Sequence, residues 1–96
     1  MIRLTELERT ALRAVVKIEG YLTESTLPVL VQTLAEYQQT GIRQVQFLAD
    51  GLLLIDPVAL EQALPHFPPD LQLSFHTSRL VVKQLLEDRG LRVVFG

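Results

Sequence analysis

Two apolar periodicities alternate along this 96-residue chain, and their alternation is the feature that most constrains its fold. Within residues 12–22, apolar and charged residues take turns, as in Val16-Lys17-Ile18-Glu19, which is typical of a half-buried strand. From Leu27 to Gly41 the apolar residues recur at helical spacing instead, and Pro28 suits the first turn of a helix.

The remaining sequence continues this alternation. Asp56 before Pro57 predicts a capped helix that extends to about Leu64, and Thr77 or Ser78 should cap a last helix that ends at Gly90. We expect Leu80, Val81, Leu85 and Leu86 to share one side of that helix. The expected extended segments are an edge strand near 2–4, residues 12–22, residues 42–48 with a turn at Asp50-Gly51 before Leu52–Ile55, residues 71–76 and residues 91–95.

Strands that alternate with helices predict an α/β fold with right-handed crossovers. We therefore expect one small domain over residues 1–96, with a mixed, mostly parallel sheet of about five strands and three helices. The first two strands should form an antiparallel edge of the sheet.

The composition argues against nucleic-acid binding and against a membrane-spanning protein. Nine basic and eleven acidic residues give a net charge of −2, which lacks the basic excess of proteins that bind nucleic acid. There is no cysteine, no apolar run near the roughly 20 residues of a membrane span, and no signal-peptide pattern at the start. We expect a cytoplasmic protein that does not span a membrane.

Catalytic and metal-binding patterns are weak. His66 and His76 are the only histidines, and neither has the ligand spacing of a metal site. The five glycines are scattered, which does not favour a phosphate-binding loop. A triad of Ser78, His76 and Asp56 is conceivable but lacks a nucleophile-elbow motif. We predict no catalytic residue, no metal and no cofactor.

Three segments of the sequence follow the motif pattern of one known family of α/β domains. Residues 15–22 (VVKIEGYL) resemble the family's strand before its first helix, and residues 78–95 (SRLVVKQLLEDRGLRVVF) resemble its third helix and last strand. Residues 45–60 (VQFLADGLLLIDPVAL) align with the family's strand, "LDLS" and "DSSG" stretch. Together these segments resemble the STAS domain family of anti-sigma factor antagonists. The resemblance implies a bacterial, non-catalytic signalling domain that binds a regulatory protein such as an anti-sigma-factor kinase.

The departures from this family pattern change the expected function. Pro57 occupies the position of the family's phosphorylated serine, Val58 that of the second serine and Ala59 that of the glycine, while Leu48 replaces an acidic residue. Of the polar groups in the motif, Asp56 alone matches. The family's phosphorylation switch therefore cannot operate at position 57.

Two further departures concern length. The segment between Leu60 and Leu71 is shorter than in typical members, and the sequence stops at Gly96, where a further helix is common. We expect an uncovered face or edge of the sheet, which favours self-association or a permanent partner.

The leading hypothesis is a protein-interaction module that is not switched by phosphorylation at position 57. The alternative is a STAS-like accessory subunit of a transport or lipid-handling assembly, with transporter subunits as partners. Two local alternatives stay open: Asp56 as a helix cap or a partner contact, and Val58 as a surface or a core residue. The predicted partner-binding residues are Thr23, Glu24, Ser25, Asp56, Pro57, Val58, Ala59 and Leu60.

Overall fold

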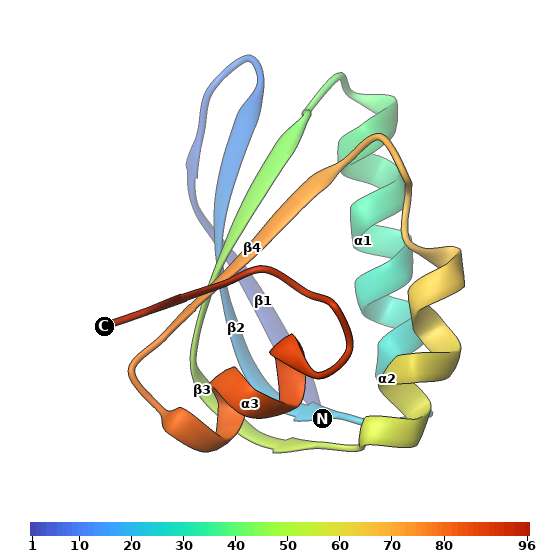
Figure 1. The fold of residues 1–96 in the computed structure, drawn as a ribbon. Helices are drawn as coiled ribbons and strands as arrows, with labels where there is room; N and C mark the ends of the chain where they lie inside the picture. The colour runs from blue at the N-terminus through green and yellow to red at the C-terminus, as the bar shows by residue number, and fades with distance from the viewer.

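The computed structural model describes residues 1–96, and its elements follow the predicted order (Figure 1). The strands are β1 (Ile2–Arg9), β2 (Arg13–Leu22), β3 (Gln44–Ile55), β4 (Gln72–Thr77) and β5 (Val93–Phe95). The helices are α1 (Leu27–Gln39), α2 (Pro57–Ala63) and α3 (Leu80–Glu87), with a short 3-10 turn, η1 (Leu64–His66), after α2.

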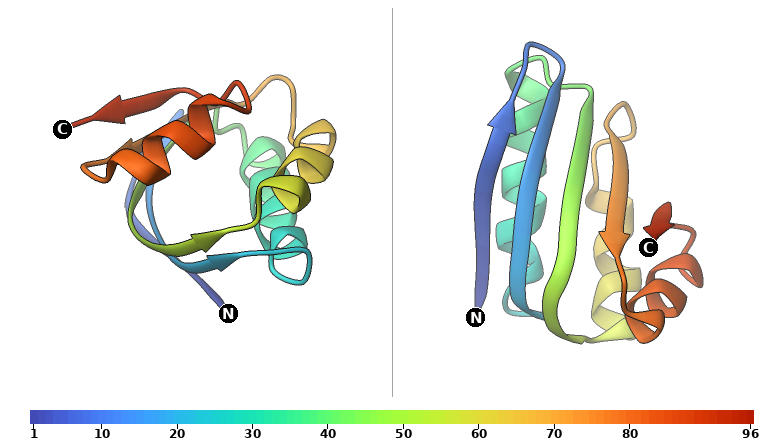
Figure 2. Two further views of the ribbon diagram at one scale, coloured as in Figure 1. Left: turned by 60° about the horizontal axis from the view of Figure 1, so that its bottom comes forward. Right: turned by 90° about the vertical axis from the view of Figure 1, so that its left-hand side faces the viewer.

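The five strands form one sheet in the order β1-β2-β3-β4-β5. β1 is antiparallel to β2, and every other neighbouring pair is parallel, so the predicted mixed sheet is confirmed. Each parallel strand is added on the same side of the one before it, so right-handed crossovers place all three helices on one face. The other face carries no helix, as the right-hand view of Figure 2 shows.

The hydrophobic core lies between the sheet and the helices. Phe47 of β3 and Phe75 of β4 stack in its centre, with ring centroids 5.0 Å apart and planes inclined by 20°. Leu34 of α1 and Leu86 of α3 are fully buried on the helical side. Burial of such a side chain contributes about 1.5–3 kcal/mol, so the faces that meet here supply most of the stability.

The turn predicted at Asp50-Gly51 is wrong, because β3 runs through both residues. The Asp50 carboxylate accepts hydrogen bonds from the Thr77 hydroxyl and the Ser78 amide, both at 2.8 Å, and so links β3 to the end of β4. A Cβ at Gly51 would lie 2.7 Å from Cγ of Glu19, so glycine here permits the close approach of β2. Both residues serve contacts with other strands, which the local sequence does not reveal.

The start and the buried side of α3 also differ from prediction. Arg79 is the N-cap residue, whereas the Thr77 hydroxyl donates a hydrogen bond to the Asp50 carboxylate. Leu80 and Val81 are 56% and 66% exposed, although both were expected on the core side. The buried residues are Val82 and Leu86, four residues apart on one side of the helix. At about 100° per residue, Leu80 falls on the opposite side.

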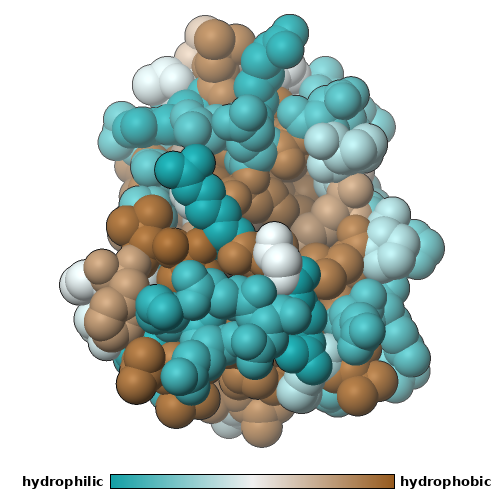
Figure 3. All heavy atoms as spheres, viewed as in Figure 1, coloured by the Kyte–Doolittle hydropathy of each residue, from teal (hydrophilic) through white to brown (hydrophobic).

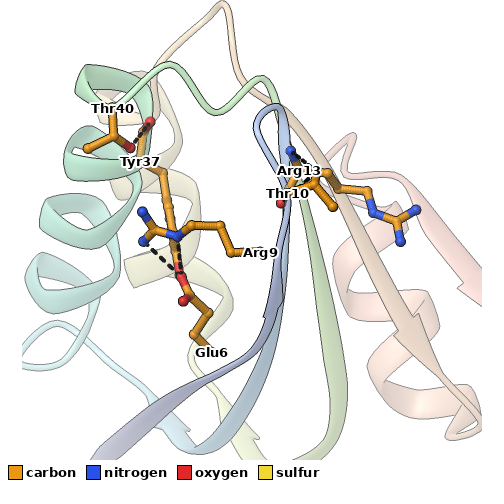
Figure 4. Close-up of polar contacts among 6 residues, drawn as sticks. All are labelled: Glu6, Arg9, Thr10, Arg13, Tyr37 and Thr40. Atoms are coloured by element: carbon orange, nitrogen blue, oxygen red, sulfur yellow. Dashed lines mark hydrogen bonds and ion pairs between the residues drawn. The ribbon is translucent and has the colours of Figure 1, made fainter.

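A polar cluster attaches the edge strand β1 to α1 (Figure 4). The Tyr37 hydroxyl donates to Oε1 of Glu6 at 2.7 Å, and Nε of Arg9 donates to the same oxygen at 2.9 Å. The Arg9 guanidinium also lies 5.1 Å from the centre of the Tyr37 ring. Burial and the hydrogen bond to Glu6 raise the pKa of Tyr37 to about 12. These contacts hold the half of β1 that has few apolar residues to bury.

Candidate functional site

The two predicted partner-binding segments are neighbours at the carboxyl edge of the sheet. Leu22 pairs with Ile55 where β2 and β3 end, and the Asp56 amide donates to the Leu22 carbonyl at 2.8 Å. The loop of residues 23–25 follows β2 directly, and α2 follows β3. The structure thus brings together segments that are far apart in the sequence, at the edge where open α/β sheets usually bind ligands.

A buried threonine shapes the first of these segments, the loop of residues 23–25. The Thr26 hydroxyl donates to the Tyr21 carbonyl at 2.6 Å and accepts the Thr23 amide at 2.9 Å. It makes no capping hydrogen bond to α1, although Thr26 occupies the N-cap position. These bonds fix a tight loop in which Glu24 and Ser25 are exposed.

The second segment is fixed by Asp56, whose predicted role as a helix cap is confirmed. Its Oδ1 accepts the amides of Val58 at 3.1 Å and Ala59 at 3.2 Å, and Pro57 takes the first helical position. A partner contact by Asp56 stays a prediction. The cap sets the direction in which the first turn of α2 leaves the sheet.

Side-chain exposure separates the predicted residues of α2. Val58 is 61% exposed, which settles the choice between a surface and a core position. Leu60 is 1% exposed and belongs to the core, so the partner contact that we expected of its side chain does not fit the structure. Ala59 is 8% exposed and lines a groove beside α1.

Three further apolar residues are exposed at the same edge, and the sequence analysis missed them. Leu53 and Leu54 are 67% and 50% exposed, and Tyr21, which pairs with Leu54, is 43% exposed. The run Leu52–Ile55 resembles a buried strand, but only its first and last residues are buried. We call Tyr21, Leu53, Leu54 and Val58 the apolar edge. In Figure 3, apolar atoms lie along the lower border, where β3 ends.

A groove of about 310 Å³ lies between α1 and α2. Leu27, Pro28 and Val31 of α1 form one wall, and the small side chains of Ala59 and Ala63 leave space on the other. Glu24 lies at its rim and so connects the groove to the loop of residues 23–25. Predicted contact residues of both segments therefore border one apolar depression.

The three side chains of the conceivable triad, Ser78, His76 and Asp56, each contact a different partner. Ser78 binds Asp50 through its amide at 2.8 Å and its hydroxyl at 3.1 Å, and these bonds together with Thr77 lower the pKa of Asp50. Nε2 of His76 lies 3.4 Å from the Ser74 hydroxyl, and Asp56 caps α2. No hydrogen bond joins any two of Asp56, His76 and Ser78.

Two wider features of the structure bear on ligands and location. No group of three or more His, Cys, Asp or Glu side chains is arranged to hold a metal ion. No helix has the length and apolar character that crossing a membrane requires.

Comparison with known proteins relates the chain to solved structures alone, since no family model and no curated protein matches its sequence. An anti-sigma factor antagonist from Mycobacterium paratuberculosis superimposes with a TM-score of 0.70 at 11% identity, over 97% of this chain and 85% of the other. The unphosphorylated anti-sigma factor antagonist SpoIIAA superimposes with a TM-score of 0.71 at 10% identity, over 98% and 88% of the two chains.

These similarities extend over nearly the whole chain and establish its architecture. The chain has the SpoIIAA-like STAS fold, with a five-stranded mixed sheet and three helices. The expectation drawn from the three STAS-like segments is therefore confirmed for the fold.

Proposed function

We propose that this chain is a non-catalytic protein-interaction module that binds a regulatory protein at the carboxyl edge of its sheet. The observation that carries the proposal is the apolar edge, Tyr21, Leu53, Leu54 and Val58, each more than 40% exposed. Exposed apolar residues that gather in one place usually mark a surface for association. Resemblance to anti-sigma factor antagonists supports a partner such as an anti-sigma-factor kinase.

The contact surface combines the apolar edge with its polar neighbours. Thr23, Glu24 and Ser25 contribute from the loop after β2, and Asp56, Pro57 and Ala59 contribute from the start of α2. The hydrogen bonds of Thr26 and Asp56 hold both segments in place before a partner arrives. Such preorganisation lowers the ordering cost of association.

Binding through this surface does not depend on phosphorylation at position 57. Proline has no hydroxyl to accept a phosphate, and the next side chain, Val58, is apolar and exposed. The interface is therefore constitutive at this position, and burial of apolar surface drives it.

The test is affinity capture from the native host followed by mass spectrometry, with wild-type, Val58→Glu and Val81→Glu proteins. Val81 is a matched control, because it is 66% exposed and lies in α3 rather than at the apolar edge. Both substitutions should leave the thermal unfolding curve unchanged, since exposed positions tolerate change within about 0.5 kcal/mol.

The expected result is a regulatory protein that the wild-type and Val81→Glu proteins retain, that Val58→Glu loses, and that phosphatase treatment does not release. Capture of the same partner by Val58→Glu would contradict the assigned surface. Recovery of transporter subunits with this mutational pattern would instead support the accessory-subunit function and contradict the regulatory one.

A further inference from the structure

The face of the sheet without helices contains a polar hollow of about 320 Å³. It lies on the parallel strands β3, β4 and β5, and the right-hand view of Figure 2 looks onto this face. Gln44 pairs with Gln72, and Gln46 pairs with Ser74, so their side chains stand in two adjacent rows. Neighbouring strands are about 4.8 Å apart, which brings these groups within reach of one small ligand.

Arg92 gives the hollow a net positive charge. Its lining contains Arg92 and His76 but no aspartate or glutamate. The guanidinium of Arg92 makes no hydrogen bond or ion pair within the chain. Elsewhere on this face, Lys17 lies 3.6 Å from Glu19 and Arg13 lies 3.7 Å from Glu8. Arg92 is therefore available to an external anion.

The neutral polar side chains of the hollow indicate which groups the rest of the ligand should carry beside its anionic group. Ser74 lies 3.4 Å from Nε2 of His76, so a hydroxyl and an imidazole adjoin each other. The amides of Gln44, Gln46 and Gln72 each offer donors and an acceptor, which matches the hydroxyl groups of a polyol. An arginine fork suits the oxygens of a phosphate group.

We propose that this hollow binds a small phosphorylated polyol. Arg92 and His76 contact the phosphate, and the glutamine amides contact the hydroxyl groups. Gln44 and Gln72 are the first residues of β3 and β4, whereas the apolar edge lies where β2 and β3 end. The hollow contains no residue of the apolar edge, so this inference goes beyond the proposed function.

The test is an NMR titration that uses the two histidines as reporters. His76 lines the hollow, and His66 lies in the turn after α2, so His66 serves as an internal control. Inorganic phosphate and glycerol phosphate are titrated at constant pH, each against sodium chloride of matched ionic strength. Either phosphate should shift the His76 ring signals until saturation and leave those of His66 in place, with glycerol phosphate effective at the lower concentration.

Three variants assign the contacts. Arg92→Ala should weaken binding of both phosphates about tenfold, in line with loss of one hydrogen bond to a charged group. Gln46→Ala should remove the advantage of glycerol phosphate over inorganic phosphate. Arg13→Ala, on the same face but outside the hollow, should change neither. Backbone amide spectra verify that each variant is folded.

Equal shifts of both histidines, equal shifts with sodium chloride, or unchanged binding by Arg92→Ala would each overturn the proposal. A lipid headgroup is the other source of the same chemistry, and phosphatidylglycerol vesicles test it. Arg92-dependent sedimentation with these vesicles, without a response to glycerol phosphate, would overturn the assignment of a soluble ligand.

Discussion

Two adjacent leucines of β3 should respond very differently to truncation. Leu52 is 1% exposed within the core, whereas Leu53 is 67% exposed at the apolar edge. Leu→Ala changes in protein cores cost about 2.7–5.0 kcal/mol, so we expect Leu52→Ala to lower the free energy of unfolding by about 3 kcal/mol. Leu53→Ala should change the same quantity by less than about 0.5 kcal/mol, because most of that side chain is already in water.

Urea denaturation followed by circular dichroism measures this difference. Urea m-values of small domains are about 1–3 kcal/mol per molar, so Leu52→Ala should lower the midpoint by roughly 1–3 M. At about 4–8 °C per kcal/mol, its melting temperature should fall by roughly 12–24 °C. Equal destabilisation by both variants would show that Leu53 is also buried, and the exposed edge on which the proposed function rests would be refuted.

Three further predictions concern two strand glycines and two ionisable groups. Gly20→Ala should lower the melting temperature more than Gly51→Ala, because the new Cβ would lie 2.3 Å from a backbone oxygen at φ +101°, whereas at Gly51 it meets a flexible side chain. The Ser78 amide is the main cause that lowers the pKa of Asp50, so this group's contribution to stability is present above its ordinary pKa of 3.8 and lost as pH falls. Thermal melts across acidic pH should therefore be less pH-dependent for Asp50→Asn. The pKa of Tyr37 rises from 10.0 to about 12, so its contribution is complete below pH 10 and lost towards pH 12, and Tyr37→Phe should remove that loss in alkaline melts.

Local periodicity was sufficient to predict the elements and their order, since strand and helix patterns are properties of short segments. The crossover rule then gave the parallel sheet with its antiparallel edge. The prediction of a turn at Asp50-Gly51 was wrong because the Asp50 carboxylate accepts hydrogen bonds from Thr77 and Ser78, which are distant in sequence. The prediction of which side of α3 is buried was partly wrong, because Leu80 and Val81 are apolar but lie outside the stripe that faces the core.

The candidate site was only partly accessible to sequence reasoning. The resemblance predicted the two segments near Thr23 and Asp56, and the structure places them side by side. The exposed leucines at the end of β3 were missed, because a run of apolar residues is read as buried unless its register is known. The polar hollow was missed for a related reason, since Gln46 and Ser74 become neighbours only through strand pairing.

The fold fixes where binding can occur, whereas individual residues decide its chemistry. This chain shares its architecture with structures at 10–11% identity, so the packed core tolerates wide change as long as its apolar pattern persists. At the carboxyl edge, Pro57 has no hydroxyl and the exposed Val58 side chain is apolar. Association there should therefore depend on apolar burial and be weakly sensitive to salt. The polar hollow on the face without helices contains the unpaired cation Arg92, directly before β5, and binding there should weaken as salt rises. Apolar and ionic recognition are thus assigned to two separate surfaces of one small domain, and their salt dependence distinguishes them.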